Sequence, residues 1–372
     1  MRIVYVHGQA IPSRTANSIQ VMQSCEAFAS IGHEVILVAP TTERRPINEI
    51  LDWYGVGGFA IRFLPIPACP QPLQPYIRTL KIVSQVMRVE ADLIYGRDVV
   101  SMSLIARIRQ TPMVLESHRP YVEPTSRIHI WAFKSLRSRP LLRGVVANTS
   151  SLRDSLQTRY PDLRVAAAPN GARPVSSHAL VYRDPPRPRV GYVGHLYPGK
   201  GMEIVSALAE RCPWASFHVV GGNEEDLASW ISRTKEIVNI VYHGFKSPAD
   251  VDSYVASFDV LIAPYQWRVW GSANTPPDEP SWISPLKLPQ YMAHGKPIIA
   301  SDMPGIRDFL DDESALLVKP DDLDQWEDAL RKLRDPKLRE ELGRTSYQRF
   351  NERHRSDTRA RNILRTLVPD IM

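Results

Sequence analysis

The chain has 372 residues, a length that favours two domains, each large enough to bury its own core. Hydrophobic residues make up 43% and charged residues 23%, which excludes a disordered chain and fits a soluble globular protein. The net charge of +6 and the pI near 9.2 indicate an anionic partner, without selecting among nucleotide, nucleic acid and membrane.

No targeting or anchoring segment is recognisable. The chain begins with the apolar run Ile3–Val6, without the basic and long apolar parts of a signal peptide. No apolar stretch reaches the roughly 20 residues that span a bilayer. Cys25, Cys69 and Cys212 lie far apart, with neither metal-ligand spacing nor a disulfide framework. We therefore expect a cytoplasmic protein, with peripheral attachment to the inner face of the membrane as the other option.

In the first half, short β-branched runs alternate with longer amphipathic segments. The predicted strands are Ile3–Val6, Glu34–Val38, Phe59–Leu64, Asp92–Tyr95, Met113–Glu116 and Gly144–Ala147. The predicted helices include Ser18–Ser30, Ile77–Val89 and Ser101–Arg109, and Gly32 is the expected C-terminal cap of the first of these. Continuous apolar strands separated by helices predict a parallel sheet covered on both faces.

The second half repeats the pattern. The predicted strands are Arg189–Val193, Ser216–Val220, Val238–Tyr242, Val260–Ala263 and Pro297–Ala300. The predicted helices are Met202–Glu210, Glu224–Thr234, Pro248–Ser257 and Leu286–Ala293, and a charged helical region from Pro336 ends in the stretch Arg349–Leu367.

These elements predict an α/β protein with two doubly wound, Rossmann-like domains that face each other across a cleft. The N-terminal domain is expected over 1–171 and the C-terminal domain over 189–349, joined by a proline-rich linker at 172–188. A helix over about 350–372 is a candidate to pack back on the N-terminal domain.

One segment has the features of an anion site. Ser284 and Pro285 fit the N-cap and the first position of a helix, and Leu286 and Lys287 follow in its first turn. A helix N-terminus favours phosphate, and a lysine there is unfavourable for the helix dipole unless an anion compensates. Gln290, on the same face, can hydrogen-bond the vicinal hydroxyls of a ribose. Ser-Pro at a helix start also has the plainer explanation of capping alone.

The run from Ser284 to Pro297, SPLKLPQYMAHGKP, resembles the pattern S-P-x-K-x-x-E-Y-M-A-x-G-x-P of the retaining glycosyltransferase family 4, whose members have the GT-B fold. A second match is Gly191–Leu196 followed by Lys200-Gly201, and weaker ones are Pro169-Asn170-Gly171, Val220-Gly221-Gly222 and Asn17-Ser18. The resemblance spans nearly the whole chain. It implies transfer of a sugar from a nucleotide diphosphate with retention of configuration, to a glycan, a lipid-linked saccharide or a small molecule.

The resemblance also implies site residues. The expected donor-binding residues are His195, Lys200, Ser284, Pro285, Leu286, Lys287 and Gln290, and those of the acceptor side are Asn17 and Ser18. Lys200, Lys287 and the helix N-terminus would form a metal-free electrostatic clamp for the diphosphate. His118 follows a strand where the family often carries a histidine in the cleft, so it is the catalytic candidate; a structural histidine is the alternative.

The chain departs from the family at its acidic pair, which falls on Trp282 and Gln290. A neutral amide at 290 can still bind ribose, so Gln290→Glu is expected to keep most activity. The loop Trp267–Ile283 carries Asp278 and Glu279, and the glycine-rich first loop is missing. An inactive nucleotide-sugar-binding protein and a nucleotide-sugar epimerase on the same fold therefore stay as alternatives.

The segment 119–143 holds six lysines and arginines and one acid, Glu123, with Tyr121, Trp131 and Phe133 among them. Basic residues interleaved with aromatic ones predict contact with an anionic membrane or a lipid-linked acceptor. The alternative is a solvated helix whose aromatic side chains belong to the core.

Other classes are less well supported. A dinucleotide-dependent oxidoreductase needs G-x-G-x-x-G, which neither His7–Ala10 nor Gly191–Gly194 provides. A nucleic-acid-binding protein is not expected, because the basic residues are dispersed outside 119–143. No Asp-x-Asp follows a strand and no His, Cys or carboxylate cluster has ligand spacing, so we expect neither a metal nor another cofactor.

Overall fold

The computed structural model describes residues 1–41, 45–56, 61–67 (backbone only), 74–122, 126–175, 180–181, 187–270 and 282–371. They form two compact units: unit 1 is Met1–Pro169 with Ser356–Met372, and unit 2 is Asn170–Arg355. The sequence-based boundary lay at 171, with a linker at 172–188. In the structure Ala172 forms an isolated bridge with Arg355 and belongs to unit 2.

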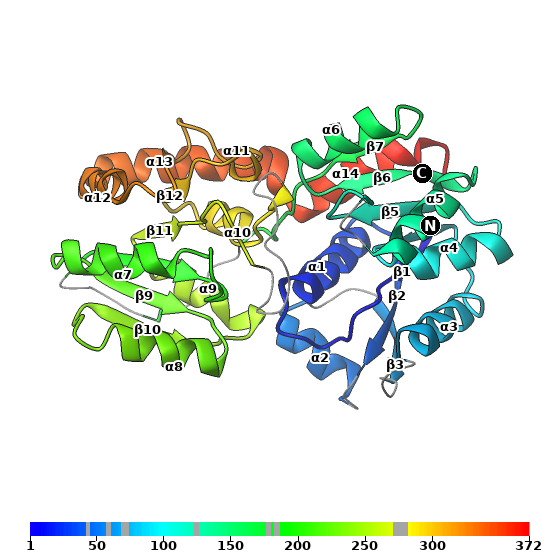
Figure 1. Cartoon of the computed structure of the whole chain (residues 1–372), viewed down its shortest axis with the longest axis horizontal. Coiled ribbons are helices and arrows are strands. Elements are labelled where there is room, and N and C mark those ends of the chain that lie inside the picture. The colour runs from blue at the N-terminus through cyan, green and yellow to red at the C-terminus, as the bar shows by residue number, and fades with distance from the viewer. Residues whose placement is uncertain are drawn as a thin grey trace. The chain divides into compact units, whose positions relative to one another are not determined.

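Unit 1 is built on a parallel sheet, whose seven strands in the described part of the chain have the order β3-β2-β1-β4-β5-β6-β7 (Figure 1). The strand side chains from β1, β2, β4, β5 and β6 are largely buried, as expected where helices cover both faces. The strands are β1 Arg2–Val6, β2 Glu34–Thr41, β3 Ile61–Pro67, β4 Leu93–Gly96, β5 Met113–Ser117, β6 Leu142–Ala147 and β7 Val165–Ala167.

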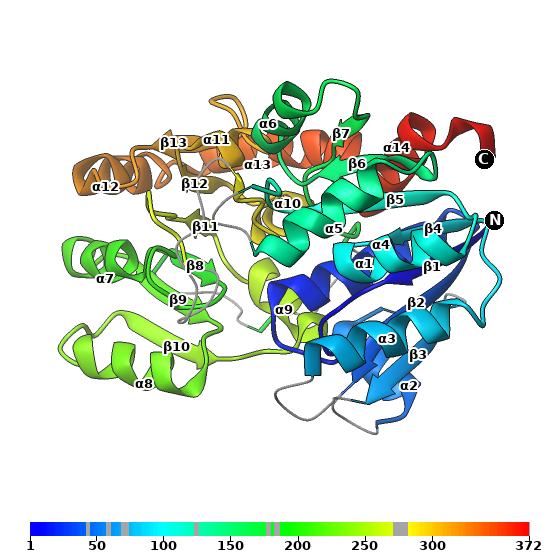
Figure 2. The ribbon, with the colours of Figure 1, turned by 45° about the vertical axis from the view of Figure 1, so that its right-hand side comes forward.

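The helices of unit 1 are α1 Ala16–Ser30, α2 Ile47–Tyr54, α3 Gln74–Val86, α4 Val99–Ile108, α5 Arg127–Arg137, α6 Ser150–Arg159 and α14 Ser356–Leu367. Helix α14 packs against α1, and apolar residues of both join one core cluster with the strands. Helices α3, α4 and α5 pack in a row (Figure 2). Helix α1 ends as predicted, because Gly32 N donates to Ala29 O and His33 N to Phe28 O.

Unit 2 repeats the architecture with the strand order β10-β9-β8-β11-β12-β13. Its strands are β8 Arg189–Val193, β9 Ser216–Val220, β10 Ile240–Gly244, β11 Val260–Ala263, β12 Ile298–Ser301 and β13 Leu316–Val318. Its helices are α7 Met202–Arg211, α8 Glu224–Arg233, α9 Pro248–Ala256, α10 Lys287–Ala293, α11 Pro304–Arg307, α12 Leu323–Lys332 and α13 Pro336–Arg349.

The two strand orders confirm the prediction of two doubly wound sheets. The chain runs outward in both directions from a central pair of strands, which is β1 and β4 in unit 1 and β8 and β11 in unit 2. Ligands of such sheets bind beyond the carboxyl ends of the strands at this switch point. The functional residues are therefore sought after these four strands.

The predicted helical stretch Arg349–Leu367 is wrong as a single element. Helix α13 ends at Arg349, a π-helical turn follows at Phe350–His354, and α14 begins at Ser356. The chain passes from unit 2 to unit 1 between the π turn and α14, so the two helices pack on different cores. Helices α2, α6, α11 and α12 and strands β7 and β13 were not predicted.

Helices in the described ranges are too short or too polar to cross a membrane. Cys25 and Cys212 are buried free thiols, and Cys69 lies outside the described residues. Among the residues whose positions are given, no three His, Cys, Asp or Glu side chains are grouped so as to hold a metal ion.

Candidate active site

The loop after β8 places Lys200 at the switch point of unit 2. Gly199 and Gly201, on either side of Lys200, have φ of +79° and +95°, a region that favours glycine. At Gly201 a Cβ atom would lie 2.0 Å from the carbonyl oxygen of Pro264, so a side chain there would collide with the chain after β11. This close approach leaves the Nζ of Lys200 5.3 Å from the ring centroid of Tyr265.

Lys287 lies beside Lys200 and is buried. Its Nζ is 4.0 Å from the ring centroid of Tyr192 and 5.0 Å from that of Tyr265. Within the described residues that Nζ has no hydrogen-bond partner. Burial, and then the charge of Lys200, hold the pKa of Lys287 well below its ordinary value. Two cations at a switch point, one of them buried and unpaired, form a site that an anion would stabilise.

The prediction that Ser284 caps a helix and Pro285 begins it is wrong. Helix α10 begins at Lys287, and no side chain caps its N-terminus. The reason is Pro289, which has no N–H and so cannot bond the carbonyl of Pro285. Ser284 instead binds Asn170, whose backbone N donates to its Oγ (3.1 Å) and whose Nδ2 donates to its carbonyl oxygen (2.7 Å). The motifs Pro169-Asn170-Gly171 and Ser284-Pro285, which are distant in the sequence, are thus joined by hydrogen bonds.

Gln290 lies one turn beyond Lys287 and has a partner that the sequence did not suggest. Its Nε2 donates to Oδ1 of Asp252, in α9, at 2.7 Å, and Nε2 of His294 lies 3.0 Å from the same oxygen. The Asp252 side chain is 14% exposed. A carboxylate is therefore present beside the position where the family pattern has glutamate. Asp278 and Glu279, the other acids considered, lie outside the described residues.

His195 also follows β8. Its ring stacks on Tyr197, with 4.9 Å between the ring centroids and 5° between the planes, and its carbonyl oxygen accepts from the Tyr192 hydroxyl at 2.6 Å. Tyr192 therefore connects His195 to Lys287, because the ammonium of Lys287 lies over the Tyr192 ring. The structure brings together three of the predicted donor residues, His195, Lys200 and Lys287, around Tyr192 and Tyr265.

In unit 1, His118 follows β5 and is about a quarter exposed, at 27% of its side chain. Its Nε2 lies 3.2 Å from Oε1 of Glu116, and its Nδ1 lies 3.2 Å from Nδ2 of Asn148. These partners fix the tautomer, with Nε2 donating to the carboxylate and Nδ1 accepting from the amide. Burial and the charge of Arg97 lower the pKa of His118 to about 4, although Glu116 raises it. His118 is thus neutral, with both nitrogens engaged.

Glu116 is the centre of the network that holds His118. It accepts hydrogen bonds from Gln20 Nε2 at 2.7 Å and from the Tyr95 hydroxyl, and Arg359 Nη2 of α14 lies 3.2 Å from its Oε1. Burial alone would raise the pKa of Glu116. The charge of Arg359 and the hydrogen bond from His118 outweigh burial, so the pKa lies well below the ordinary value.

Asn17 and Ser18, the predicted acceptor-side residues, lie in the first turn of α1. The Ser18 hydroxyl donates to the carbonyls of Ser13 (2.7 Å) and Thr15 (2.9 Å) and is buried. Asn17 Nδ2 donates to Gln9 at 2.7 Å, and its Oδ1 has no hydrogen-bond partner among the described residues. Ser18 shapes the start of the helix, and of the two residues Asn17 is the one with an unused polar atom.

The basic segment 119–143 divides between core and surface. Tyr121 and Phe133 are buried and stacked, with centroids 4.4 Å apart. Trp131 is 47% exposed, and the Arg107 guanidinium lies 4.9 Å from its ring centroid. Arg137 binds Asp162 through both carboxylate oxygens. The alternative that the aromatic side chains belong to the core therefore holds for Tyr121 and Phe133. Glu123 lies outside the described residues.

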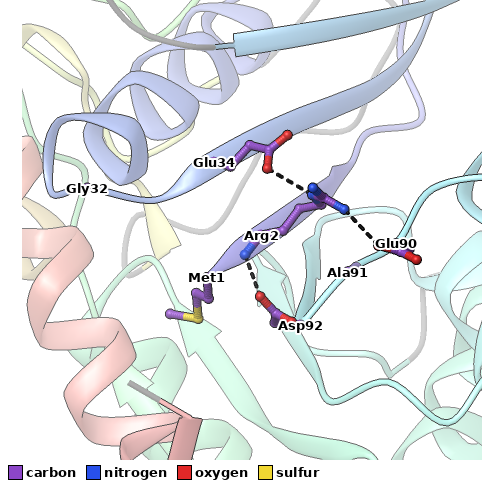
Figure 3. A pocket seen from close by; sticks show the side chains of 7 residues that line it. All are labelled: Met1, Arg2, Gly32, Glu34, Glu90, Ala91 and Asp92. Atoms are coloured by element: carbon purple, nitrogen blue, oxygen red, sulfur yellow. Dashed lines mark hydrogen bonds and ion pairs between the residues drawn. The ribbon is translucent and has the colours of Figure 1, made fainter.

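A pocket of about 470 Å³ lies at the opposite edge of the unit 1 sheet (Figure 3). It is lined at the amino ends of β1, β2 and β4, where Arg2 binds Glu34 (2.9 Å), Glu90 (3.1 Å) and, through its backbone N, Asp92 (2.6 Å). The pocket thus lies at the end of the sheet away from the carboxyl ends of the strands, and its charged side chains pair with one another, so we assign it no ligand.

Sequence reasoning missed three contributors to the site. Asp252 is 38 residues from its partner Gln290, and Tyr192 and Tyr265 look like strand and loop residues with no polar task. The signal for Asp252 was an acid on the polar side of a helix, which is common on protein surfaces. Only the fold places it against Gln290.

Comparisons with known proteins agree with this arrangement. The family described as "Glycosyltransferase Family 4" matches residues 18–174, and "Glycosyl transferases group 1" matches 187–335, together more than half of the chain. A Bacillus subtilis (strain 168) glycosyltransferase, TuaH, which its name assigns to teichuronic acid biosynthesis, is 24% identical over 115 residues. That match covers 31% of this chain and 27% of the relative, so the chain matches about a quarter of that protein's length.

Solved structures share the fold over the full length. Sucrose-phosphate synthase from Thermosynechococcus elongatus has a TM-score of 0.75 and 16% identity, over 98% of this chain and 97% of that one. HepE from Anabaena, solved with UDP and glucose, has a TM-score of 0.71 and 16% identity, over 99% of each chain. The chain therefore belongs to the family 4 glycosyltransferases and has their GT-B fold.

Proposed function

We propose that this glycosyltransferase takes its sugar from a nucleotide diphosphate, whose phosphates bind to Lys200 and Lys287 in unit 2. The observation that carries the proposal is the buried ammonium of Lys287, which has no hydrogen-bond partner in the described part of the chain and lies at the β8–β11 switch point. A diphosphate would supply the missing acceptors and offset the repulsion between the two lysines. The UDP bound by HepE is consistent with this class of donor.

The proposal is tested by calorimetric titration with UDP, GDP and ADP. Replacing Lys200 or Lys287 by alanine should weaken binding of the preferred nucleotide diphosphate by about 2–4 kcal/mol, since each variant lacks one charge-assisted contact. Lys235→Ala is the control, because Lys235 is 73% exposed and its Nζ lies 3.7 Å from the carboxylate of the adjacent Glu236. Unchanged affinity in both site variants would exclude the two-lysine site.

We further infer a reaction with retention and without a divalent metal. The two lysines and the polar groups around them are available to stabilise the charge of the leaving diphosphate, which a metal ion does in other transferases. The leaving phosphate is then placed to accept the proton of the attacking hydroxyl. Glycan, lipid-linked saccharide and small-molecule acceptors are all compatible with this scheme.

His118 is proposed as the unit 1 residue that contacts the transferred sugar. Because Nε2 donates to Glu116 and Nδ1 accepts from Asn148, it is a poor proton acceptor. Its task would be to position the sugar with the exposed part of its ring. His118→Ala should lower kcat more than it weakens nucleotide diphosphate binding.

We also propose that α5 meets an anionic membrane or a lipid-linked acceptor. Arg127, Trp131 and Lys134 are exposed on this helix at spacings of four and three residues, which places them along one face, and Ile128 is exposed beside them. An exposed tryptophan between two cations is the composition of an interfacial helix. Arg137, paired with Asp162, is not part of this face.

A further inference from the structure

The carboxyl ends of β1 and β4 place His7 and Arg97 together at the switch point of unit 1. Val6 and Gly96 are register partners at the ends of these adjacent parallel strands, so His7 and Arg97 are the first residues beyond them. Arg97 N also donates to Val6 O at 3.1 Å. This location corresponds to the one where Lys200 and Lys287 lie in unit 2, since both units reverse their strand order there.

His7 is almost fully buried, at 1% exposure, and neither ring nitrogen has a hydrogen-bond partner in the described ranges. Burial, followed by the charges of Arg97 and Arg78, lowers the pKa of His7 to about 3. The ring is therefore neutral, with one N–H donor and one acceptor. A buried polar group without a partner costs about 1–3 kcal/mol, and ligand contact is one reason for such a group to exist.

Two arginines near His7 lack carboxylate partners among the described residues. Arg97 Nη1 donates at 2.5 Å to Gln20, a neutral amide, and the Nε of Arg78 in α3 is buried without a hydrogen bond. The nearby carboxylate of Glu116 forms its ion pair with Arg359, and the charge of Arg97 adds to the lowering of the Glu116 pKa without a direct contact.

One further carboxylate lies near this edge of the sheet. Asp98 accepts from Val100 N, Ser101 N and the Ser101 hydroxyl at the start of α4. A Cβ on Gly8 would lie 2.7 Å from its Oδ2, so the chain after His7 packs closely on Asp98. These three donors are neutral, so Asp98 keeps its charge, but among the described residues it forms no ion pair with Arg78 or Arg97.

We propose that His7, Arg78 and Arg97 form a second oxyanion site, which holds a carboxylate or phosphate group of the acceptor. Two guanidinium groups and a neutral imidazole N–H offer donors in the arrangement that such groups accept. The assignment to the acceptor rests on the proposed function, in which the donor diphosphate occupies unit 2. The acceptor is then an anionic sugar or sugar phosphate rather than a neutral one.

The test is titration of the full chain with inorganic phosphate, glucose 6-phosphate and glucuronate, in the presence of saturating UDP. All three probes carry a phosphate or carboxylate group, and the probe that binds most tightly shows which of the two groups the site prefers. Arg78→Gln and Arg97→Gln should each weaken binding about tenfold or more. Arg78→Lys and Arg97→Lys should lose less. Arg153→Gln, on the exposed surface of α6, is the control and should bind as the native chain does.

Two results would overturn the site. One is binding that both glutamine variants leave unchanged. The other is competition by UDP, which would mean that the probes enter the lysine site of unit 2. If none of UDP, GDP and ADP binds, the proposed function fails, and the same titrations without a nucleotide still decide the arginine site. Thermal unfolding of each variant separates loss of binding from loss of folding, and Arg78→Gln, at a partly exposed position, serves if Arg97→Gln does not fold.

Discussion

The side-chain amide of Gln290 donates a 2.7 Å hydrogen bond to the carboxylate of Asp252, which also binds His294. This contact changes the expectation for Gln290→Glu. A glutamate would replace the donating N–H by a second carboxylate against Asp252, and two adjacent carboxylates repel each other.

Gln290→Glu should therefore destabilise unit 2 by about 1–3 kcal/mol at pH 7 and weaken nucleotide diphosphate binding. The loss should shrink as the pH falls and one carboxylate of the pair takes up a proton. Urea unfolding at pH 7 and pH 5 measures it. The double variant Gln290→Glu with Asp252→Asn reverses the polarity of the contact and should recover most of the loss. An unchanged free energy of unfolding in Gln290→Glu would show that the contact between Gln290 and Asp252 contributes nothing to stability.

Binding of a nucleotide diphosphate should be accompanied by proton uptake at Lys287. Burial and Lys200 lower the pKa of this ammonium in the free protein, and a bound anion raises it again. Between the two pKa values the Lys287 side chain is neutral in the free protein and charged in the complex, so affinity for the diphosphate falls as the pH rises through that window. Calorimetry in buffers of different ionisation enthalpy reports the uptake. Lys287→Met should abolish it, and equal heats in all buffers for the native chain would contradict the assignment.

Activity should survive an excess of chelator, and the product should keep the anomeric configuration of the donor. Metal independence follows from a leaving diphosphate whose charge is stabilised by lysines. Retention follows from attack on the face that the diphosphate leaves, where the leaving phosphate accepts the proton of the attacking hydroxyl. Initial rates with and without chelator and NMR of the product give the answer. Loss of activity that a divalent ion restores, or an inverted product, would reject this mechanism.

Arg359→Met should cost about 3–5 kcal/mol in the free energy of unfolding of unit 1, because it leaves the buried carboxylate of Glu116 without its cation. The pKa of Glu116 is depressed, so the pair stabilises fully above the ordinary carboxyl pKa of about 4.3 and loses its effect as the pH falls through the folded-state pKa. The difference between native chain and variant should then narrow in acid. Arg361→Met, in an exposed pair of the same helix, should change stability by less than about 0.5 kcal/mol.

Charge reversal at Arg127 and Lys134 should reduce sedimentation with anionic vesicles and leave neutral vesicles unaffected. Each cation near an anionic surface contributes about 1 kcal/mol, and added salt should weaken the effect. Arg153→Glu combined with Arg159→Glu, both in α6, is the matched control because this double variant makes the same change of charge elsewhere on unit 1. Equal sedimentation of the native and reversed chains would leave α5 as a solvated helix.

The fold was predictable because its signals are local. Buried parallel strands are continuous apolar runs, and Arg189–Val193, Ser216–Val220 and Val260–Ala263 were predicted with the bounds that the structure has. The start of α10 was not predicted correctly. The Ser284-Pro285 pair is a local helix-start signal, but Pro289 lacks the N–H that would bond the carbonyl of Pro285, four residues earlier.

The candidate site was predictable only in part. Lys200 and Lys287 stood out as lysines next to turn and helix signals. The partners of Gln290 and Glu116 come from residues 38 and 243 positions away, and no sequence periodicity reports such contacts. His7 looked like an ordinary residue after a strand, because its burial depends on elements that are distant in the chain.

Because α14 belongs to unit 1 but follows unit 2 in the chain, unit 1 is completed last during translation. Glu116 leaves the ribosome long before Arg359, and all of unit 2 is translated between them. At about 5–20 residues per second, the interval is on the order of ten seconds or more. During this time the surfaces of α1, β6 and β7 that α14 covers in the folded chain stay exposed. Unit 2, a continuous segment, can fold before unit 1 is complete, and nascent chains that stop short of α14 should be the ones that chaperones retain.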